Sequence, residues 1–229
     1  MTQPGGGDPS VVPGVEGQTA AALLGWGAPV AGDEFDYVGP PDPARWGLYE
    51  GAGHDNNGRR VASAWSVDGD VVTVRGNTAG DSGGMAYRTG QYRGKWEARM
   101  RAPVGDPDYH PVLLLWPDAE DWPVGGEVDY AEISDPDRQN VDFFLHYGAS
   151  NSQTQTSRAL DVTQWHNYAV EWTDRCIIGY IDGAQWFADC EPGHQPPRAM
   201  HMTIQLDAFN GDGPYRPSEM MVDWIRQYR

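Results

Sequence analysis

The chain has 229 residues and a formal net charge of −17, which argues against nucleic acid or an anionic membrane as a partner. A neutral polysaccharide is compatible with this charge, whereas a heavily sulfated one is disfavoured. The length suits one all-β domain, and no segment approaches the roughly 18 apolar residues of a membrane-spanning helix.

Residues 1–32 are rich in glycine and proline, and we predict that they form a flexible leader ahead of a single domain at 33–229. They lack a basic region followed by an apolar core, and the apolar run 20–24 is too short to supply one. The leader is therefore not expected to be a secretory signal peptide.

Beyond the leader, apolar residues recur with a period of two, which predicts short β-strands and no amphipathic helix. In the first clear strand, Trp96, Ala98 and Met100 alternate with charged residues. Turns rich in aspartate, asparagine, glycine and proline are predicted at 68–70, 135–137 and 210–214. Many short strands separated by such turns predict an antiparallel sandwich.

The next element, the run 125–133, places three carboxyl groups within six residues of a strand-forming segment. Glu127 and Asp129 are two apart and share a face, whereas an unbroken strand would turn Glu132 to the opposite face. A β-bulge at 130–131 would restore Glu132 to the shared face, where like charges raise at least one pKa. Two carboxyl groups with separated pKa values are what glycoside hydrolysis requires; a solvated acidic strand is the alternative.

Aromatic residues surround this acidic strand. Trp116 and Trp122 precede it, each directly followed by proline, and His146 lies on the next predicted strand, 142–147. Aromatic rings beside paired acids suit sugars, whose C–H faces stack on the rings. The chain has ten tryptophans and eleven tyrosines against five phenylalanines, a balance that favours wet interfaces.

The later predicted strands are 168–172, 177–181 and 200–207. We expect Trp165 and Trp172, which flank the first of these, to be core residues. The last strand has an apolar face formed by Met200, Met202, Ile204 and Leu206. Its other face is polar and carries Gln205 and Asp207.

The two cysteines are predicted to form a disulfide across a hairpin. A three-residue loop at 182–184 would pair Ile181 with Gln185, and counting outward places Cys176 opposite Cys190. Cross-strand partners lie at distances that a disulfide can bridge, and a loop of that size contributes on the order of 3 kcal/mol. Two buried free thiols are the alternative.

The acidic run Gly126-Glu127-Val128-Asp129-Tyr130-Ala131-Glu132 resembles the active-site signature of glycoside hydrolase family 16, which contains laminarinases, lichenases, agarases and carrageenases. Its spacing is similar to the bulged form found in laminarinases and some carrageenases. Other segments follow the family's order: 33–35, 82–84, 94–99, 122–123, 165–172, 180–183 and 222–226. The resemblance covers residues 33–229.

The resemblance implies a β-jelly roll of two curved antiparallel sheets, with the substrate lying across the concave sheet. It also implies a retaining mechanism, in which Glu127 is the nucleophile and Glu132 the general acid/base. Asp129, between them, would hold Glu127 by a hydrogen bond. No catalytic cofactor is implied, and no clustered histidine or cysteine indicates a metal at the active site.

The same resemblance assigns groove residues. Trp122 is expected to stack on a sugar at the cleavage point, and His146 to lie near the acid/base. Trp116 matches another groove aromatic, although a core position is the alternative for it, as an ordinary strand position is for His146. Gln205 and Asp207 are expected to contact sugar hydroxyl groups.

One segment departs from the family's pattern. Residues 108–116 take the place of a stretch that usually reads Pro-Ala-Phe-Trp after a small or aromatic residue. We therefore expect His110, with Tyr109, to reshape the donor side of the groove.

Many members of the family bind a structural calcium ion on the convex side. Asp223 matches the aspartate that they use, and Gly69 could supply a backbone carbonyl. Ligation by oxygen alone suits calcium, and a solvated strand aspartate is the alternative for Asp223.

The leading hypothesis is a retaining endo-β-glycosidase acting on a polysaccharide, and the bulged spacing with His146 favours a β-1,3-glucan. The alternatives are the same chemistry on a galactan or host cell-surface glycan, a carbohydrate-binding module, and a virion or adhesin domain. The presence of all three acids argues against a module that only binds. The protein is expected outside the cell, as a monomer or as a domain of a larger protein. Without an export signal, the chain would be trimmed, excised from a larger protein, or viral and released by lysis.

Overall fold

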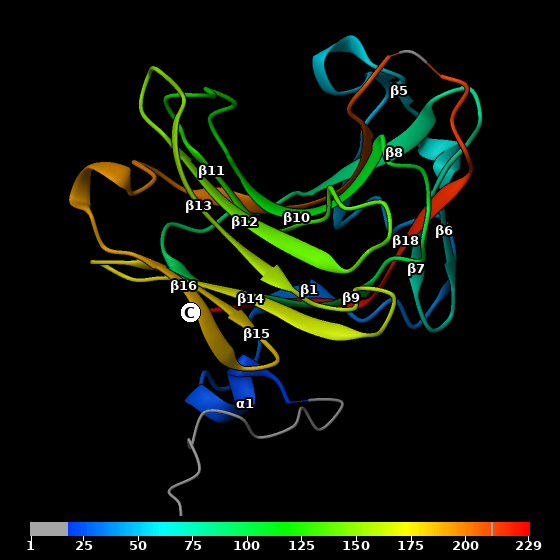
Figure 1. Ribbon diagram of the computed structural model, residues 1–229. Helices are drawn as coiled ribbons and strands as arrows, with labels where there is room; N and C mark the ends of the chain where they lie inside the picture. The colour runs from blue at the N-terminus through cyan, green and yellow to red at the C-terminus, as the bar shows by residue number, and fades with distance from the viewer. Residues whose placement is uncertain (1–17, 212) are drawn as a thin grey trace, which may run out of the picture.

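The computed structural model describes residues 18–211 and 213–229, and within them two nine-stranded sheets pack face to face (Figure 1). The predicted jelly-roll sandwich is confirmed. The convex sheet runs in the order β16 (Ala184–Asp189), β15 (Ile177–Ile181), β14 (His166–Trp172), β9 (Gly94–Arg101), β18 (Ser218–Tyr228), β7 (Val72–Gly76), β6 (Trp65–Asp68) and β2 (Val38–Gly39), with β1 (Ala31–Asp33) paired to β18.

The concave sheet runs in the order β13 (Ser152–Ala159), β12 (Asn140–Tyr147), β11 (Glu127–Glu132), β10 (Tyr109–Pro117), β17 (Met200–Ala208), β8 (Asp81–Tyr87), β5 (Arg59–Arg60) and β4 (Gly51–Ala52), with β3 (Trp46–Leu48) paired to β8. Neighbouring strands are antiparallel except β5 and β8. The helices are α1 (Ala20–Leu24) and the 3-10 turns η1 (His54–Asn56), η2 (Ala62–Ala64) and η3 (Pro192–His194). None of the helices in the described part of the chain is long and apolar enough to cross a membrane.

The core lies between the sheets and contains the apolar faces that the alternation predicts. On β9 these are Trp96, Ala98 and Met100, and on β17 they are Met200, Met202, Ile204 and Leu206, all fully buried. Burying each methionine, isoleucine or leucine of this set contributes roughly 1.5–3 kcal/mol. The opposite face of β17 is thereby directed to the concave surface.

Tryptophan placement corrects one prediction. Trp172 is buried in the core as expected. Trp165, also expected there, lies partly exposed just before β14, with the guanidinium carbons of Arg99 and Arg101 at 5.6 and 5.0 Å from its ring. The period-two pattern of apolar residues could not distinguish the two tryptophans, because it applies within a strand and Trp165 precedes the strand. The ring of Trp165 instead contacts cationic side chains of β9.

The cysteines form the predicted disulfide, although the predicted loop is wrong. Asp182 and Gly183, with φ values of 49° and 74°, make a two-residue turn, so Ile181 pairs with Ala184. A register shift further along β16 compensates for the shorter turn. Cys176 and Cys190 therefore still meet, with Cα atoms 4.1 Å apart.

The predicted leader contains helix α1 and the start of β1; residues 1–17 of it lie outside the described range. Helix α1 begins after Thr19, whose side chain accepts a hydrogen bond from Ala22 N, and ends at Gly25 with φ 67°. Ala20 packs with Ala169 and Tyr180 of the convex sheet. This short helix depends on tertiary contacts that composition does not show.

Glu97 anchors α1 from β9. Its carboxylate oxygens accept hydrogen bonds from Ala20 N and Ala21 N, at 2.6 and 3.2 Å, and the side chain has no exposed surface. Burial raises the pKa of Glu97 to about 7, and the two backbone hydrogen bonds only partly oppose that rise. The folded protein therefore binds a proton at Glu97 more tightly than the unfolded chain does.

A Glu97→Gln variant is expected to change the pH dependence of stability. The stability that Glu97 protonation contributes is fully present below pH 4.5 and is lost as pH rises through about 7. Wild-type unfolding free energy should thus fall, relative to the variant, by on the order of 3 kcal/mol across that range. Thermal melts from pH 4.5 to pH 8 measure this, with exposed Glu191→Gln as the control. Parallel curves for wild type and Glu97→Gln would contradict it.

Candidate active site

The central strand of the site, β11, contains the predicted bulge. Against β10 the pairing skips Tyr130, and against β12 the register shifts between Asp129 and Glu132. Tyr130 is fully buried, and the extra residue returns Glu132 to the face shared by Glu127 and Asp129. All three acids line one hollow of about 350 Å³ on the concave sheet.

Neighbouring strands complete the floor of this hollow. His146 on β12 lies opposite Glu127. On the other side, Val112 of β10 pairs with Glu132 and also with Gln205 of β17. Gln205 is therefore on the groove floor two strands from Glu132, as the polar face of β17 predicts.

Burial and mutual repulsion determine the protonation of the acids. Asp129 is 3 % exposed, and burial, with the Glu132 charge, raises its pKa well above the ordinary value. Burial also raises the pKa of Glu127, and the Asp129 charge adds to this, whereas His146 and a hydrogen bond from Trp122 lower it. Because two adjacent carboxylates repel each other, the pair favours holding one proton. We place that proton on Asp129, the more deeply buried of the two.

His146 lies beside Asp129, which corrects the expectation that it neighbours Glu132. Its Nε2 is 3.4 Å from Asp129 Oδ2, and its Nδ1 is 2.9 Å from Asn151 Oδ1. In the part of the chain that the structure describes, Glu127, Asp129 and His146 offer ligand atoms within 4.8 Å of one another and could hold a divalent ion. The sequence analysis named all three residues but indicated no metal, because the cluster forms only when β11 and β12 pair.

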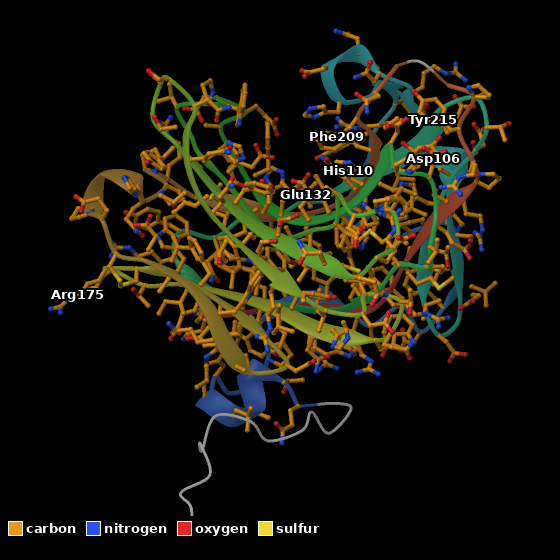
Figure 2. All side chains as sticks on the ribbon, viewed as in Figure 1. Asp106, His110, Glu132, Arg175, Phe209 and Tyr215 are labelled. Atoms are coloured by element: carbon orange, nitrogen blue, oxygen red, sulfur yellow. A yellow bond between two sulfur atoms is a disulfide. The ribbon has the colours of Figure 1, made fainter. Side chains whose placement is uncertain are left out.

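The histidine that contacts Glu132 is His110, at the start of β10. Its Nδ1 lies 3.1 Å from Glu132 Oε1. Its ring stacks on Phe209 with centroids 3.9 Å apart, and Figure 2 shows the three residues together on the concave side. The departure from the family's pattern at 108–116 is therefore next to Glu132. Phe209 was not predicted, since it follows β17 in a loop.

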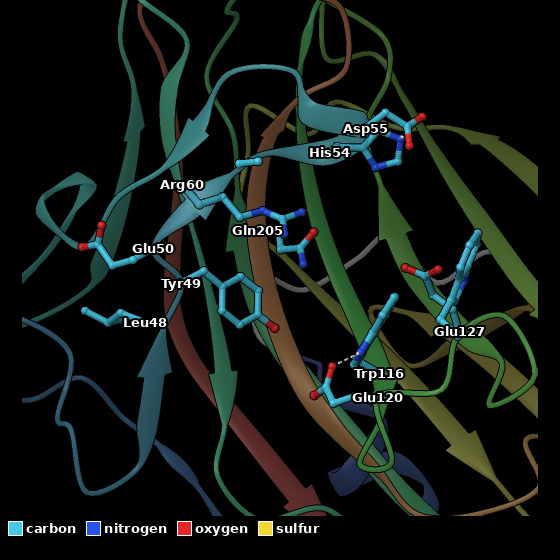
Figure 3. A pocket seen from close by; sticks show the side chains of 12 residues that line it. Leu48, Tyr49, Glu50, His54, Asp55, Arg60, Trp116, Glu120, Glu127 and Gln205 are labelled. Carbon is cyan, nitrogen blue, oxygen red and sulfur yellow. Dashed lines mark hydrogen bonds and ion pairs between the residues drawn. The ribbon is translucent and has the colours of Figure 1, made fainter.

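Trp116 and Trp122 form an aromatic wall on one side of Glu127, and Figure 3 shows Trp116 beside Glu120. The two indole rings are within 10° of parallel with centroids 6.4 Å apart, and Trp116 Nε1–H donates to Glu120 Oε2 over 2.8 Å. Both rings line a second hollow, of about 590 Å³, that shares Glu127 and Gln205 with the first. Trp122 is 43 % exposed, and Trp116 lies in the groove and not in the core.

Asp207 lines the groove with its charge already neutralised. Its two oxygens accept hydrogen bonds from Arg60, one from Nε at 2.8 Å and one from Nη2. Arg60, whose guanidinium carbon lies 5.4 Å from the Tyr49 ring, also lines the groove. Contact of Asp207 with sugar hydroxyl groups stays a prediction. Sequence reasoning missed Arg60 and Tyr49 because the segment 49–60 has no strand-like alternation.

The structural calcium ion stays a prediction, and the aspartate expected to bind it forms an ion pair. Asp223 Oδ2 lies 3.2 Å from Arg99 Nε, so a guanidinium already serves as its cationic partner. Gly69 lies in the turn between β6 and β7 with φ 104°. Among the described residues, the group of three acidic and histidine side chains close enough to share an ion is the cluster around Asp129, on the concave sheet.

The site combines features suited to substitution at a sugar carbon. One carboxyl group, Glu127, stands beside an aromatic wall, and a second, Glu132, lies further along the same strand face. Such a pair can divide nucleophilic attack and proton transfer between its members. The two hollows share Glu127, Trp122 and Gln205 in their linings.

Comparison with known proteins gives consistent matches. The sequence profile of "Glycosyl hydrolases family 16" matches residues 70–226. The chain is 26 % identical to a "Beta-glucanase" of Rhodothermus marinus over 86 % of this chain and 83 % of that protein. It is 28 % identical to "Endo-1,3-1,4-beta-glycanase EglC" of Rhizobium meliloti, over 73 % of this chain but 40 % of that protein.

A similar fold occurs in the laminarinase catalytic domain of Thermotoga maritima. The TM-score is 0.75 at 18 % identity, over 88 % of this chain and 98 % of that one.

Proposed function

The chain belongs to glycosyl hydrolases family 16, and from that premise we propose that it is a retaining endo-β-glycosidase that cleaves a β-1,3-glucan or a mixed β-1,3-1,4-glucan. The observation that carries the proposal is the bulge at Tyr130, which aligns Glu127, Asp129 and Glu132 on one face inside a groove. A module that only binds has no need for this alignment.

In the first step, Glu127 attacks the anomeric carbon and Glu132 gives its proton to the departing glycosidic oxygen. The product is a glycosyl-enzyme with inverted configuration at that carbon. In the second step, Glu132 takes a proton from water, the water oxygen displaces Glu127, and the original β configuration returns. The proton on Asp129 keeps Glu127 ionised through the hydrogen bond between them. Two carboxyl groups perform the whole cycle, so no cofactor is required.

The substrate proposal rests on the groove and on the relatives. The Rhodothermus protein is named a beta-glucanase, and the Rhizobium one an endo-1,3-1,4-beta-glycanase. Neutral glucan is compatible with the net charge of −17. The hollows of about 590 and 350 Å³ continue from one to the other past Glu127, which supports cleavage within a polymer.

Two further parts of the proposal concern the cell compartment and calcium. We propose action outside the cytoplasm, because the Cys176–Cys190 disulfide suits an oxidising compartment. A structural calcium ion is not included, because the Asp223 carboxylate is paired with Arg99.

The test is release of reducing ends from laminarin, lichenan, agarose, carrageenan and arabinogalactan, with ¹H NMR of the first product. We expect activity on laminarin or lichenan, a mixture of oligosaccharides, and the β anomer before mutarotation. Cleavage of agarose or arabinogalactan would move the substrate to a galactan. Binding to laminarin without any soluble product would overturn the enzymatic proposal.

A further inference from the structure

Glu132 and His110 form a contact that the two-step mechanism above does not use. His110 Nδ1 is 3.1 Å from Glu132 Oε1, and their side chains are 14 % and 13 % exposed. The contact joins neighbouring strands, since His110 is the second residue of β10 and Glu132 is the last of β11. The contact does not involve the nucleophile, because Glu127 lies at the opposite end of β11.

A stack of three rings fixes the position of His110. Phe209 lies between His110 and His54, with centroid distances of 3.9 and 4.2 Å and planes within 17° and 16° of parallel. The backbone of Phe209 is held on both sides, since its N–H donates to Asp108 O and its carbonyl accepts from Asn57 Nδ2, each over 2.8 Å. The imidazole therefore has little freedom to turn away from Glu132.

The charged neighbours of His110 do not compete for it. Asp207 is its cross-strand partner on β17, but both Asp207 oxygens accept hydrogen bonds from Arg60. Among the groups named by the hydrogen bonds and ion pairs of the described residues, Glu132 is the polar side chain that His110 contacts.

We infer that His110 is a positioning residue for the acid/base: its Nδ1–H donates to Glu132 Oε1 and directs the proton of Glu132 to Oε2, toward the groove. The inference rests on the proposed function. A protonated carboxyl group accepts on its carbonyl oxygen, so a fixed donor at one oxygen leaves the proton on the other. The same donor binds the ionised form more strongly, so Glu132 keeps one orientation while it alternates between acid and base.

The consequence for rate depends on the leaving group. A sugar alcohol departs only with a proton, whereas 2,4-dinitrophenolate departs without one. If His110 acts through proton delivery, its loss should slow cleavage of polysaccharide and spare cleavage of a dinitrophenyl glycoside. In both cases kcat/KM is compared, because it reports the step that forms the glycosyl-enzyme.

The experiment measures kcat/KM of each variant on laminarin and on dinitrophenyl β-laminaribioside. His110→Phe keeps the ring and its stacking but removes the donor, and we expect its laminarin-to-dinitrophenyl ratio to fall roughly 10²-fold. His110→Asn places an amide N–H near the former Nδ1 and should restore the ratio to within a few-fold. Glu132→Gln gives the reference for complete loss of the acid.

The matched control is His54→Phe, the same substitution on the other side of Phe209, which leaves the ratio unchanged because His54 does not contact Glu132. An equal loss on both substrates for His110→Phe, or no loss, would overturn the inference. So would failure of His110→Asn to recover the ratio at an unchanged melting temperature. If wild type cleaves neither substrate, the proposed function itself has failed, and with it the premise.

Discussion

Replacing Glu127 with glutamine lowers kcat on a β-glucan roughly 10⁴-fold or more, because no covalent intermediate can form without the carboxylate nucleophile. The variant should fold as well as wild type or better. Burial disfavours the ionised Glu127 side chain, and a neutral amide removes that cost. Reducing-end assays and thermal melts on the same preparations measure both quantities.

Glu120→Gln is the matched control, because Glu120 lines the same groove and accepts from Trp116 but is not on β11. Its kcat should remain well above that of Glu127→Gln. Glu127 would lose its role as nucleophile if its amide variant retained more than about one hundredth of wild-type kcat. A large fall in its melting temperature would instead indicate that the side chain is structural.

Replacing Arg138 with methionine is expected to lower the free energy of unfolding by roughly 4 kcal/mol. Arg138 has no exposed surface, and its guanidinium donates to four carbonyl groups. The acceptors are Pro103 O at 3.3 Å, Ile133 O at 3.2 Å, Asp135 O at 3.2 Å and Tyr109 O at 2.9 Å. Burial lowers the pKa of Arg138 to about 10, yet the side chain stays charged at neutral pH.

Methionine fills similar volume but leaves those carbonyl groups without their donor, so the melting temperature should fall by about 10 °C. Arg158→Met, at an exposed position on β13, is the control and should change it little. Equal melting temperatures for the two variants would show that water replaces the guanidinium without loss. Because Ile133 and Tyr109 adjoin Glu132 and His110 in sequence, the same variant should also weaken activity.

The strands and the acid trio could be predicted because local rules determine them. Alternation identified the buried faces of β9 and β17, and the five-residue gap between Glu127 and Glu132 required a bulge for a shared face. The disulfide was also predicted, although from a loop one residue too long. Two errors cancelled there, because the shift within β16 offsets the two-residue turn.

What the sequence did not show depends on contacts between distant segments. In the sequence, Arg138 looks like an ordinary polar residue of a turn. Its role as a buried hydrogen-bond donor depends on four carbonyl groups that come together only in the fold. Arg60 and Phe209 come from loops that the alternation does not describe. The partners of His146 and His110 follow from the register of β10, β11 and β12, which brings His146 to Asp129 and His110 to Glu132.

The packing of α1 on the convex sheet determines how the protein can be attached to a solid support or a label. Figure 1 shows α1 under β14 and β15, on the side of the sandwich away from the strands that carry the acids. A bead, a fluorophore or a fusion partner joined ahead of Gln18 would therefore lie on the convex side of the sandwich. The groove on the concave side would stay accessible to a polymer. Immobilisation through that end should preserve access for long chains, whereas attachment near η1 would obstruct it.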